Sequence, residues 1–235
     1  MGVFLYLDTV LIPLSLFLMV GYHANLLHSF KNRPSCTSIG IDALKRKVWF
    51  LGLKEGGDNK TGMLAVQSLR NTIMATILTA SIAILVNLAL AALINNSYNG
   101  SYMFKTAIFG SQSGRIFALK YGTASLFLVV SFFCSSMALG YLIDANFLIN
   151  SSSVGELITS SSPTPDASYT QTIFERGFIL ALVGNRVLCM AFPLLLWMFG
   201  PLPVILSSVA LLWGLYELDF VAKFTASESV ISLDT

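Results

Sequence analysis

The chain has 235 residues, of which 55% are hydrophobic and only 11% are charged, and its formal net charge is +2. Soluble domains carry about 25% charged residues, and the mean hydropathy of this chain is +0.74. These values exclude an ordinary soluble protein and indicate a single membrane domain over residues 1–235 with no separate catalytic domain. The few basic residues gather in one segment and form no stripe along the chain, so the expected partner is the lipid bilayer and not nucleic acid.

Apolar runs long enough to cross a bilayer recur along the whole sequence. A transmembrane helix needs about 20 mostly apolar residues, and such runs lie at 3–27, 72–94, 124–148, 178–199 and 203–220. The first run lacks a positive leader and is too long for a signal peptide, so we expect it to remain as a helix. The sequence predicts an all-α polytopic transmembrane helix bundle of about five spans, or four spans with a re-entrant fifth segment.

The distribution of basic residues predicts the orientation. Eight lie between residues 29 and 70: Lys31, Arg33, Lys45, Arg46, Lys47, Lys54, Lys60 and Arg70. The positive-inside rule therefore places this segment in the cytosol and the N-terminus outside, in the plasma membrane or an endomembrane. The glycosylation sequons at Asn95 and Asn99 then fall on the external side.

Two connecting segments differ in composition from the apolar runs. Residues 29–63 read as a basic cytosolic loop. Residues 150–172 are rich in Ser, Thr and Pro and lack apolar periodicity, which is typical of a flexible linker.

Arg186 is the polar residue that most needs an explanation, because it lies about 12 Å into the run 178–199. A central membrane arginine costs about 2.5–3.5 kcal/mol on insertion scales and usually faces protein or water. With five spans, the third and fifth spans end on the side of the membrane where the fourth begins. This brings Asp144 and the end of the last span to the same side as the start of the run that contains Arg186. We therefore predict a polar cluster in the cytosolic half of the bundle, formed by Arg186, Asn185, Asp144, Arg70, Asn71, His23, Glu217 and Asp219.

Two functions fit such a cluster best, and an intramembrane enzyme that acts on lipid is a third alternative. In the first, the arginines attract an anion or a small polar solute in a channel or transporter. In the second, Arg186 is neutralised by Asp144 or Glu217 and fixes the bundle of a membrane scaffold or assembly factor.

Motifs for enzymes and cofactors are not found in the sequence. HExxH, GxSxG, the P-loop and CxxCH do not occur, so we expect no enzyme, no catalytic residues, no cofactor and no metal site. Cys36, Cys134 and Cys189 are widely spaced and suggest no disulfide framework. Small residues such as Ser136 and Gly140 suit close helix packing, and a homo-oligomer is compatible with the sequence.

A sharper hypothesis concerns Gly184, which directly precedes Asn185 and Arg186. We expect either a straight helix there or an irregular one, broken again by "GPLP" at 200–203, as in the discontinuous helices of transporters. Continuous helical hydrogen bonding through residues 180–190 would exclude the second form.

Four blocks of the sequence resemble the DUF599 family of membrane proteins, especially its plant members. They are "LDTVLIPLSL" to "GYHANL" within 7–27, "AVQSLRNTIMATILTA" at 65–80, "VGNRVLCMAFPLLLWMFGP" at 183–201 and "YELDFV" at 216–221. The resemblance implies an integral membrane protein and transfers no activity. It also implies that certain polar residues occupy motif positions: Asp8, His23, Arg70, Asn71, Asn185, Arg186 and Asp219.

Overall fold

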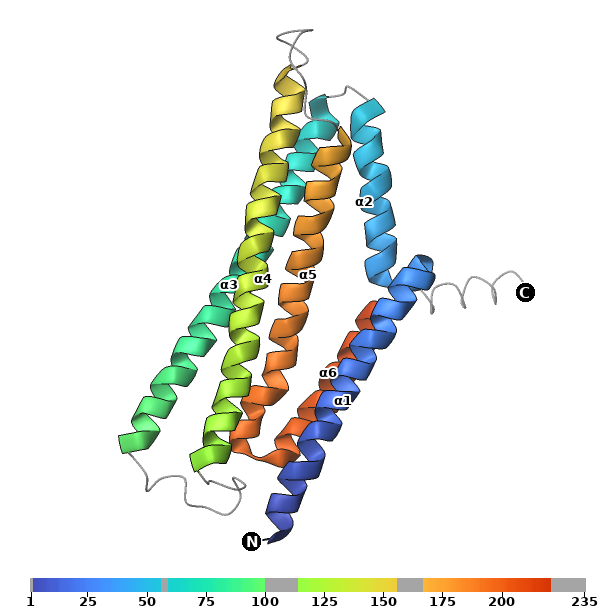
Figure 1. Ribbon diagram of the computed structural model, residues 1–235. Coiled ribbons are helices and arrows are strands. Elements are labelled where there is room, and N and C mark those ends of the chain that lie inside the picture. The colour runs from blue at the N-terminus through green and yellow to red at the C-terminus, as the bar shows by residue number, and fades with distance from the viewer. Residues whose placement is uncertain (1, 56–58, 100–113, 156–166, 221–235) are drawn as a thin grey trace, which may run out of the picture. The chain divides into compact units, whose positions relative to one another are not determined.

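The computed structural model describes residues 2–55, 59–99, 114–155 and 167–220. Every regular element in these ranges is helical, so the all-α prediction is confirmed. The helices are α1 (Gly2–Asn32), α2 (Ser38–Glu55), α3 (Asn59–Asn99), α4 (Gly114–Gly155), α5 (Ala167–Leu196) and α6 (Pro201–Asp219), with short 3₁₀ helices η1 (Pro34–Cys36) and η3 (Trp197–Phe199) (Figure 1).

Five of the helices are long and apolar enough to cross a membrane, as the sequence predicts. The candidate spans are Val10–Asn32, Val66–Asn95, Ala118–Asn150, Ser168–Phe199 and Pro201–Asp219. The last is one continuous helix of 19 residues, or about 28 Å, close to the thickness of the hydrocarbon layer. Its continuity favours a fifth span over a re-entrant segment.

The helices extend beyond the boundaries that hydropathy predicts. The segment 29–63, expected to be a loop, contains η1 and the whole of α2. The expected linker 150–172 begins inside α4 and ends inside α5, while its central part, 156–166, lies outside the described residues. The reason is physical: an apolar run marks where a helix meets lipid, but backbone hydrogen bonds can continue through polar residues beyond it.

The chain divides into two compact units. Unit 1 consists of Met1–Val48, Phe104–Lys120 and Phe192–Thr235, and unit 2 consists of Trp49–Met103 and Tyr121–Ala191. We describe each unit separately.

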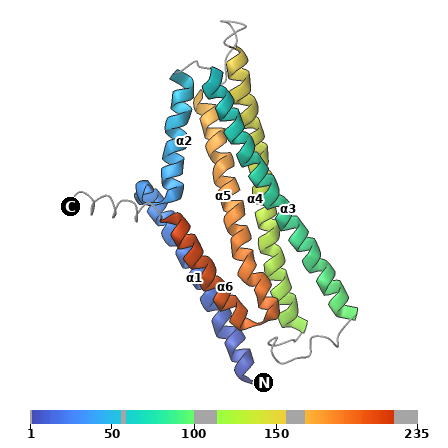
Figure 2. The same ribbon diagram turned by 180° about the vertical axis from the view of Figure 1, so that it is seen from behind.

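In unit 1, α1 and α6 lie side by side in both views (Figures 1 and 2). Their buried residues are spaced by three, four or seven positions, which places them on one side of each helix. On α1 these residues are Ile12, Ser15, Met19 and Leu26, and on α6 they are Val204, Ser208, Leu215 and Asp219. The contact between the first and last membrane helices is therefore a continuous seam.

A compact corner joins α1 to α2. Thr37 is buried, and its hydroxyl accepts a hydrogen bond from the Gly40 amide at 3.2 Å. It thus caps the first turn of α2. A Cβ atom at Gly40 would collide with the backbone of Pro34, so this corner requires glycine.

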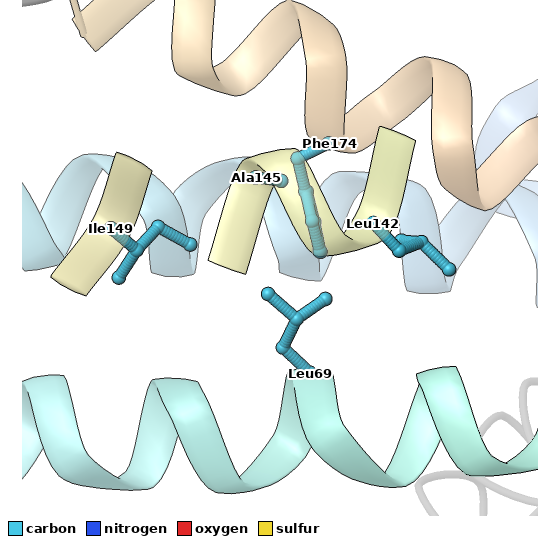
Figure 3. Close-up of a cluster of buried hydrophobic side chains, with 5 residues drawn as sticks. All are labelled: Leu69, Leu142, Ala145, Ile149 and Phe174. Atoms are coloured by element: carbon cyan, nitrogen blue, oxygen red, sulfur yellow. The ribbon is translucent and has the colours of Figure 1, made fainter. Parts of the chain in front are cut away.

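In unit 2, α3, α4 and α5 pack around a cluster of buried apolar side chains: Leu69, Leu142, Ala145, Ile149 and Phe174 (Figure 3). Gly177 of α5 lies beside Leu142 of α4, and Gly184 of α5 lies beside Ser135 of α4. Seven residues forward along α5 therefore correspond to seven residues back along α4. The two helices are therefore antiparallel, in a register that assigns each residue of α5 to a level on α4.

The turn before α6 depends on one glycine. Gly200 has φ 132°, a backbone conformation that side-chain-bearing residues rarely adopt. Pro201 follows at the first position of α6, where its fixed φ suits a helix start and its missing N–H costs nothing. The "GPLP" break predicted from the sequence is thereby confirmed.

Candidate functional site

The exposed residues of α3, α4 and α5 change character along the helix axes. We define an apolar band as residues 72–94, 118–140 and 179–199, and a polar end as residues 63–71, 141–150 and 168–178. In the band, every exposed described residue is apolar or glycine except Ser136 and Asn185. The part of the band on α4 is about 34 Å long, similar to the hydrocarbon thickness of about 30 Å. The band is the part of these helices suited to lipid.

The polar end has a different surface. Its exposed polar residues are Gln67, Ser68, Arg70, Asn71, Asp144, Asn150, Ser168, Tyr169, Thr172, Glu175 and Arg176. Its interior holds the apolar cluster of Figure 3. Exposed apolar residues also occur at this end, namely Met63, Leu64, Ile143 and Phe147. Polar groups are nevertheless concentrated here, so the candidate spans of 30–33 residues extend past the apolar band.

Three predicted site residues belong to the polar end. Arg70, Asn71 and Asp144 are all exposed there. Their exposure among other polar residues is compatible with a position outside the hydrocarbon layer, where a charge is not costly.

Arg186 and Asn185 lie in the apolar band of α5, near its middle. By the register of α4 and α5, Arg186 is level with Phe133 and Asp144 is level with Glu175. The levels of Arg186 and Asp144 are about 16 Å apart. That separation is too large for a direct ion pair, so the expected proximity of Asp144 to Arg186 does not follow from the structure.

The contact between α4 and α5 is closest at Gly184. Ser131 Oγ donates a hydrogen bond to the Gly184 carbonyl at 2.7 Å, and a Cβ atom at Gly184 would collide with Ser135 Oγ. The Ser135 hydroxyl is buried without a hydrogen-bond partner. Two hydroxyl groups and one glycine thus join these helices inside the band.

The fourth span is regular at this point. The helix α5 is continuous from Ala167 to Leu196, so the hypothesis of an irregular helix at Gly184 is wrong. Glycine serves there to admit α4 at short distance. Since successive helical residues are about 100° apart, Asn185 and Arg186 point away from the side of α5 that Gly184 presents to α4.

The other three predicted residues belong to unit 1. Asp219 is 1% exposed, and its carboxylate accepts a hydrogen bond of 2.6 Å from the Tyr22 hydroxyl. The Nδ1 atom of His23 lies 2.8 Å from the Met19 carbonyl, while its Nε2 atom is buried without a partner. Glu217 is exposed.

These contacts give Asp219 and His23 clear structural roles. Tyr22 ties the end of α6 to α1, and the carbonyl contact indicates that Nδ1 of His23 carries the proton. Because these residues and Arg186 belong to different units, the single cluster of eight residues stays a prediction. Within the described residues, no group of three His, Cys, Asp or Glu side chains could hold a metal ion.

A family model described as "Protein of unknown function, DUF599" matches residues 10–224. The chain belongs to the DUF599 family. The match covers all eight predicted site residues and all five candidate spans, and it confirms the resemblance read from the sequence blocks. No curated protein and no solved structure matches this DUF599 chain.

Sequence reasoning missed several residues of this DUF599 protein that the fold brings together. Neither Tyr22 nor Lys120 stands out in the sequence, since one is among many aromatic residues and the other lies at the edge of an apolar run. Their partners are distant in sequence: Asp219 for Tyr22, and Trp197 for Lys120. The small-residue spacing in α4 was a usable signal for close packing, but the hydroxyls at the contact are Ser131 and Ser135.

Proposed function

We propose that this DUF599 protein is a small channel or transporter that handles an anion or a small polar solute, with Arg186 as the group that attracts it. The proposal rests on one observation. Arg186 and Asn185 are adjacent polar residues inside a band whose other exposed residues, apart from Ser136, are apolar or glycine. They lie on a side of α5 other than the one that Gly184 presents to α4.

The chemistry of this pair suits an anion. A guanidinium group is always charged and offers five N–H donors in a planar fork. The neighbouring carboxamide of Asn185 adds two donors and an acceptor for a polar solute. Ionisable residues inside membrane segments usually face a polar interior and mark solute pathways.

The close contact between α4 and α5 involves Gly184, Ser131 and Ser135. Asn185 and Arg186 occupy other angular positions on α5, which supports a role for them beyond this contact. The scaffold alternative is favoured for Asp219, whose bond with Tyr22 joins α1 and α6.

The test is water access to the position of Arg186. We would introduce Arg186→Cys, and separately Phe133→Cys as a control at an exposed apolar position of α4 level with Arg186, in a chain whose Cys36, Cys134 and Cys189 are replaced. A small charged methanethiosulfonate reagent would be added from the side of the polar end. The basic residues near α2 support a cytosolic location for that side.

We expect rapid labelling of Arg186→Cys and slow labelling of Phe133→Cys. Liposomes containing the intact protein should then show chloride or phosphate flux that Arg186→Gln abolishes. Equal, slow labelling of both cysteines in folded protein would mean a dry arginine and would overturn the proposal in favour of a scaffold.

A further inference from the structure

Lys120 and Trp197 form a second polar site, at the opposite end of the apolar band from the polar end. Lys120 lies in the first turns of the α4 span and is only 3% exposed, while Trp197 begins η3 and is 6% exposed. The Lys120 Nζ atom lies 5.6 Å from the centroid of the Trp197 ring, within the range of a cation–π interaction. Both residues belong to unit 1.

One polar atom of this site is unsatisfied. The indole Nε1 of Trp197 is buried and has no hydrogen-bond partner. An indole nitrogen can only donate, and a buried donor without an acceptor costs about 1–3 kcal/mol. The missing group is therefore an acceptor, such as an oxygen atom.

The cation beside the indole specifies what kind of acceptor fits. An ammonium group favours an anionic oxygen over a neutral one, because charge-assisted hydrogen bonds are roughly twice as strong as neutral ones. A phosphate carries several such oxygens. One phosphate can accept from the indole N–H in the plane of the ring and from the ammonium group above its face.

The surroundings indicate that the phosphate comes from a lipid. Leu119, which precedes Lys120, and Phe199, two residues after Trp197, are both 56% exposed, and both lie at the edge of the apolar band. Tryptophan is enriched at this depth, where lipid headgroups begin, and basic pockets between membrane helices bind phosphorylated headgroups. An acyl chain can contact the two apolar residues while its headgroup reaches the polar pair.

We propose that Lys120 and Trp197 bind the phosphate of a membrane lipid at the Gly200 turn. The site is separate from Arg186, and its test needs no transport assay. Bound lipid would complete the hydrogen bonding of η3 and hold the turn between α5 and α6.

The experiment uses Trp197 as its own probe. The chain has three tryptophans, so Trp49→Phe with Trp213→Phe leaves Trp197 as the sole emitter. Detergent-solubilised protein would be titrated with phosphatidylglycerol, with diacylglycerol, which lacks phosphate, and with inorganic phosphate. We expect a saturable red shift of the emission with phosphatidylglycerol alone, because an acceptor then binds the indole N–H.

Lipid retention, measured by native mass spectrometry, tests the two side chains separately. Trp197→Phe keeps the aromatic ring but removes the N–H, and Trp213→Phe is its matched control, since Trp213 is exposed on α6. Lys120→Met removes the charge, whereas Lys120→Arg keeps it. Phosphatidylglycerol binding should weaken about tenfold or more in Trp197→Phe and Lys120→Met and change little in the other two variants.

Each outcome decides the proposal. A shift with inorganic phosphate but not with phosphatidylglycerol would overturn the lipid source and identify a soluble anion instead. An equal shift with diacylglycerol, or unchanged retention in both Trp197→Phe and Lys120→Met, would overturn the site itself.

Discussion

At the scale of single residues, the membrane interior of this protein contains two kinds of polar group. Hydroxyls such as that of Ser131 are buried between helices and donate hydrogen bonds to backbone carbonyls. Lipid cannot form such hydrogen bonds. Arg186 and Asn185 point away from that helix contact. The first kind stabilises the contact between α4 and α5, and the second is the kind on which the proposed function depends.

Gly184 provides a direct measure of how tightly α4 and α5 pack. Replacing Gly184 with leucine should destabilise the protein by about 2–3 kcal/mol, since the side chain has no space beside Ser135. The matched control is Gly140→Leu on α4, where an added Cβ meets nothing within 4 Å. Thermal unfolding in detergent measures both, and an equal loss of Tm in the two variants would refute the close contact.

The sequence identifies polar residues better than it identifies their partners. Arg186 is recognisable because it interrupts an apolar run, and small-residue spacing on α4 correctly indicates close packing. The bond from Tyr22 to Asp219 joins residues 197 positions apart, which no local pattern specifies. Likewise, the sequence places Asp144 and Arg186 close together, because each lies near the same end of its apolar run. The register of α4 against α5, given by the contacts of Gly177 and Gly184, instead puts the two residues at different levels.

At the scale of secondary-structure elements, helix length and membrane thickness are different quantities. Hydropathy predicts the existence and number of the apolar helices correctly. It underestimates their lengths, because α3 and α4 run to 41 and 42 residues through polar sequence that water and the Leu69 cluster stabilise. Hydropathy also misses α2, because this helix mixes apolar and charged residues. Its first turn is capped by the Thr37 hydroxyl.

The turn between η3 and α6 is an element-scale feature with a sharp test. Gly200→Ala places a Cβ atom on a backbone with φ 132°, which should cost about 1–3 kcal/mol. Gly214→Ala is the control within α6, because nothing lies within 4 Å of its added Cβ and alanine favours a helix. Denaturation midpoints should fall for the first variant only; a stable Gly200→Ala protein would mean that the turn can adopt another conformation.

At the scale of the whole molecule, five crossings require that successive connections alternate between the two sides of the membrane. Cysteines replacing the exposed residues Lys47, Asn95 and Ser168 should report this in a background without native cysteines. We expect a membrane-impermeant maleimide to label Lys47→Cys and Ser168→Cys from the cytosolic side and Asn95→Cys from the opposite side. Labelling of all three from one side would contradict the alternation.

The seam between α1 and α6 also constrains how the protein is made. The first membrane helix ends at Asn32, and its partner is complete only at Asp219. At a synthesis rate of about 5–20 residues per second, α1 waits on the order of 10–40 s in the bilayer before Tyr22 can donate its hydrogen bond to Asp219 of α6. Unit 1 is thus finished last although it begins first, and a ribosome that stalls before α6 leaves a chain whose polar seam is open to quality-control proteins of the membrane.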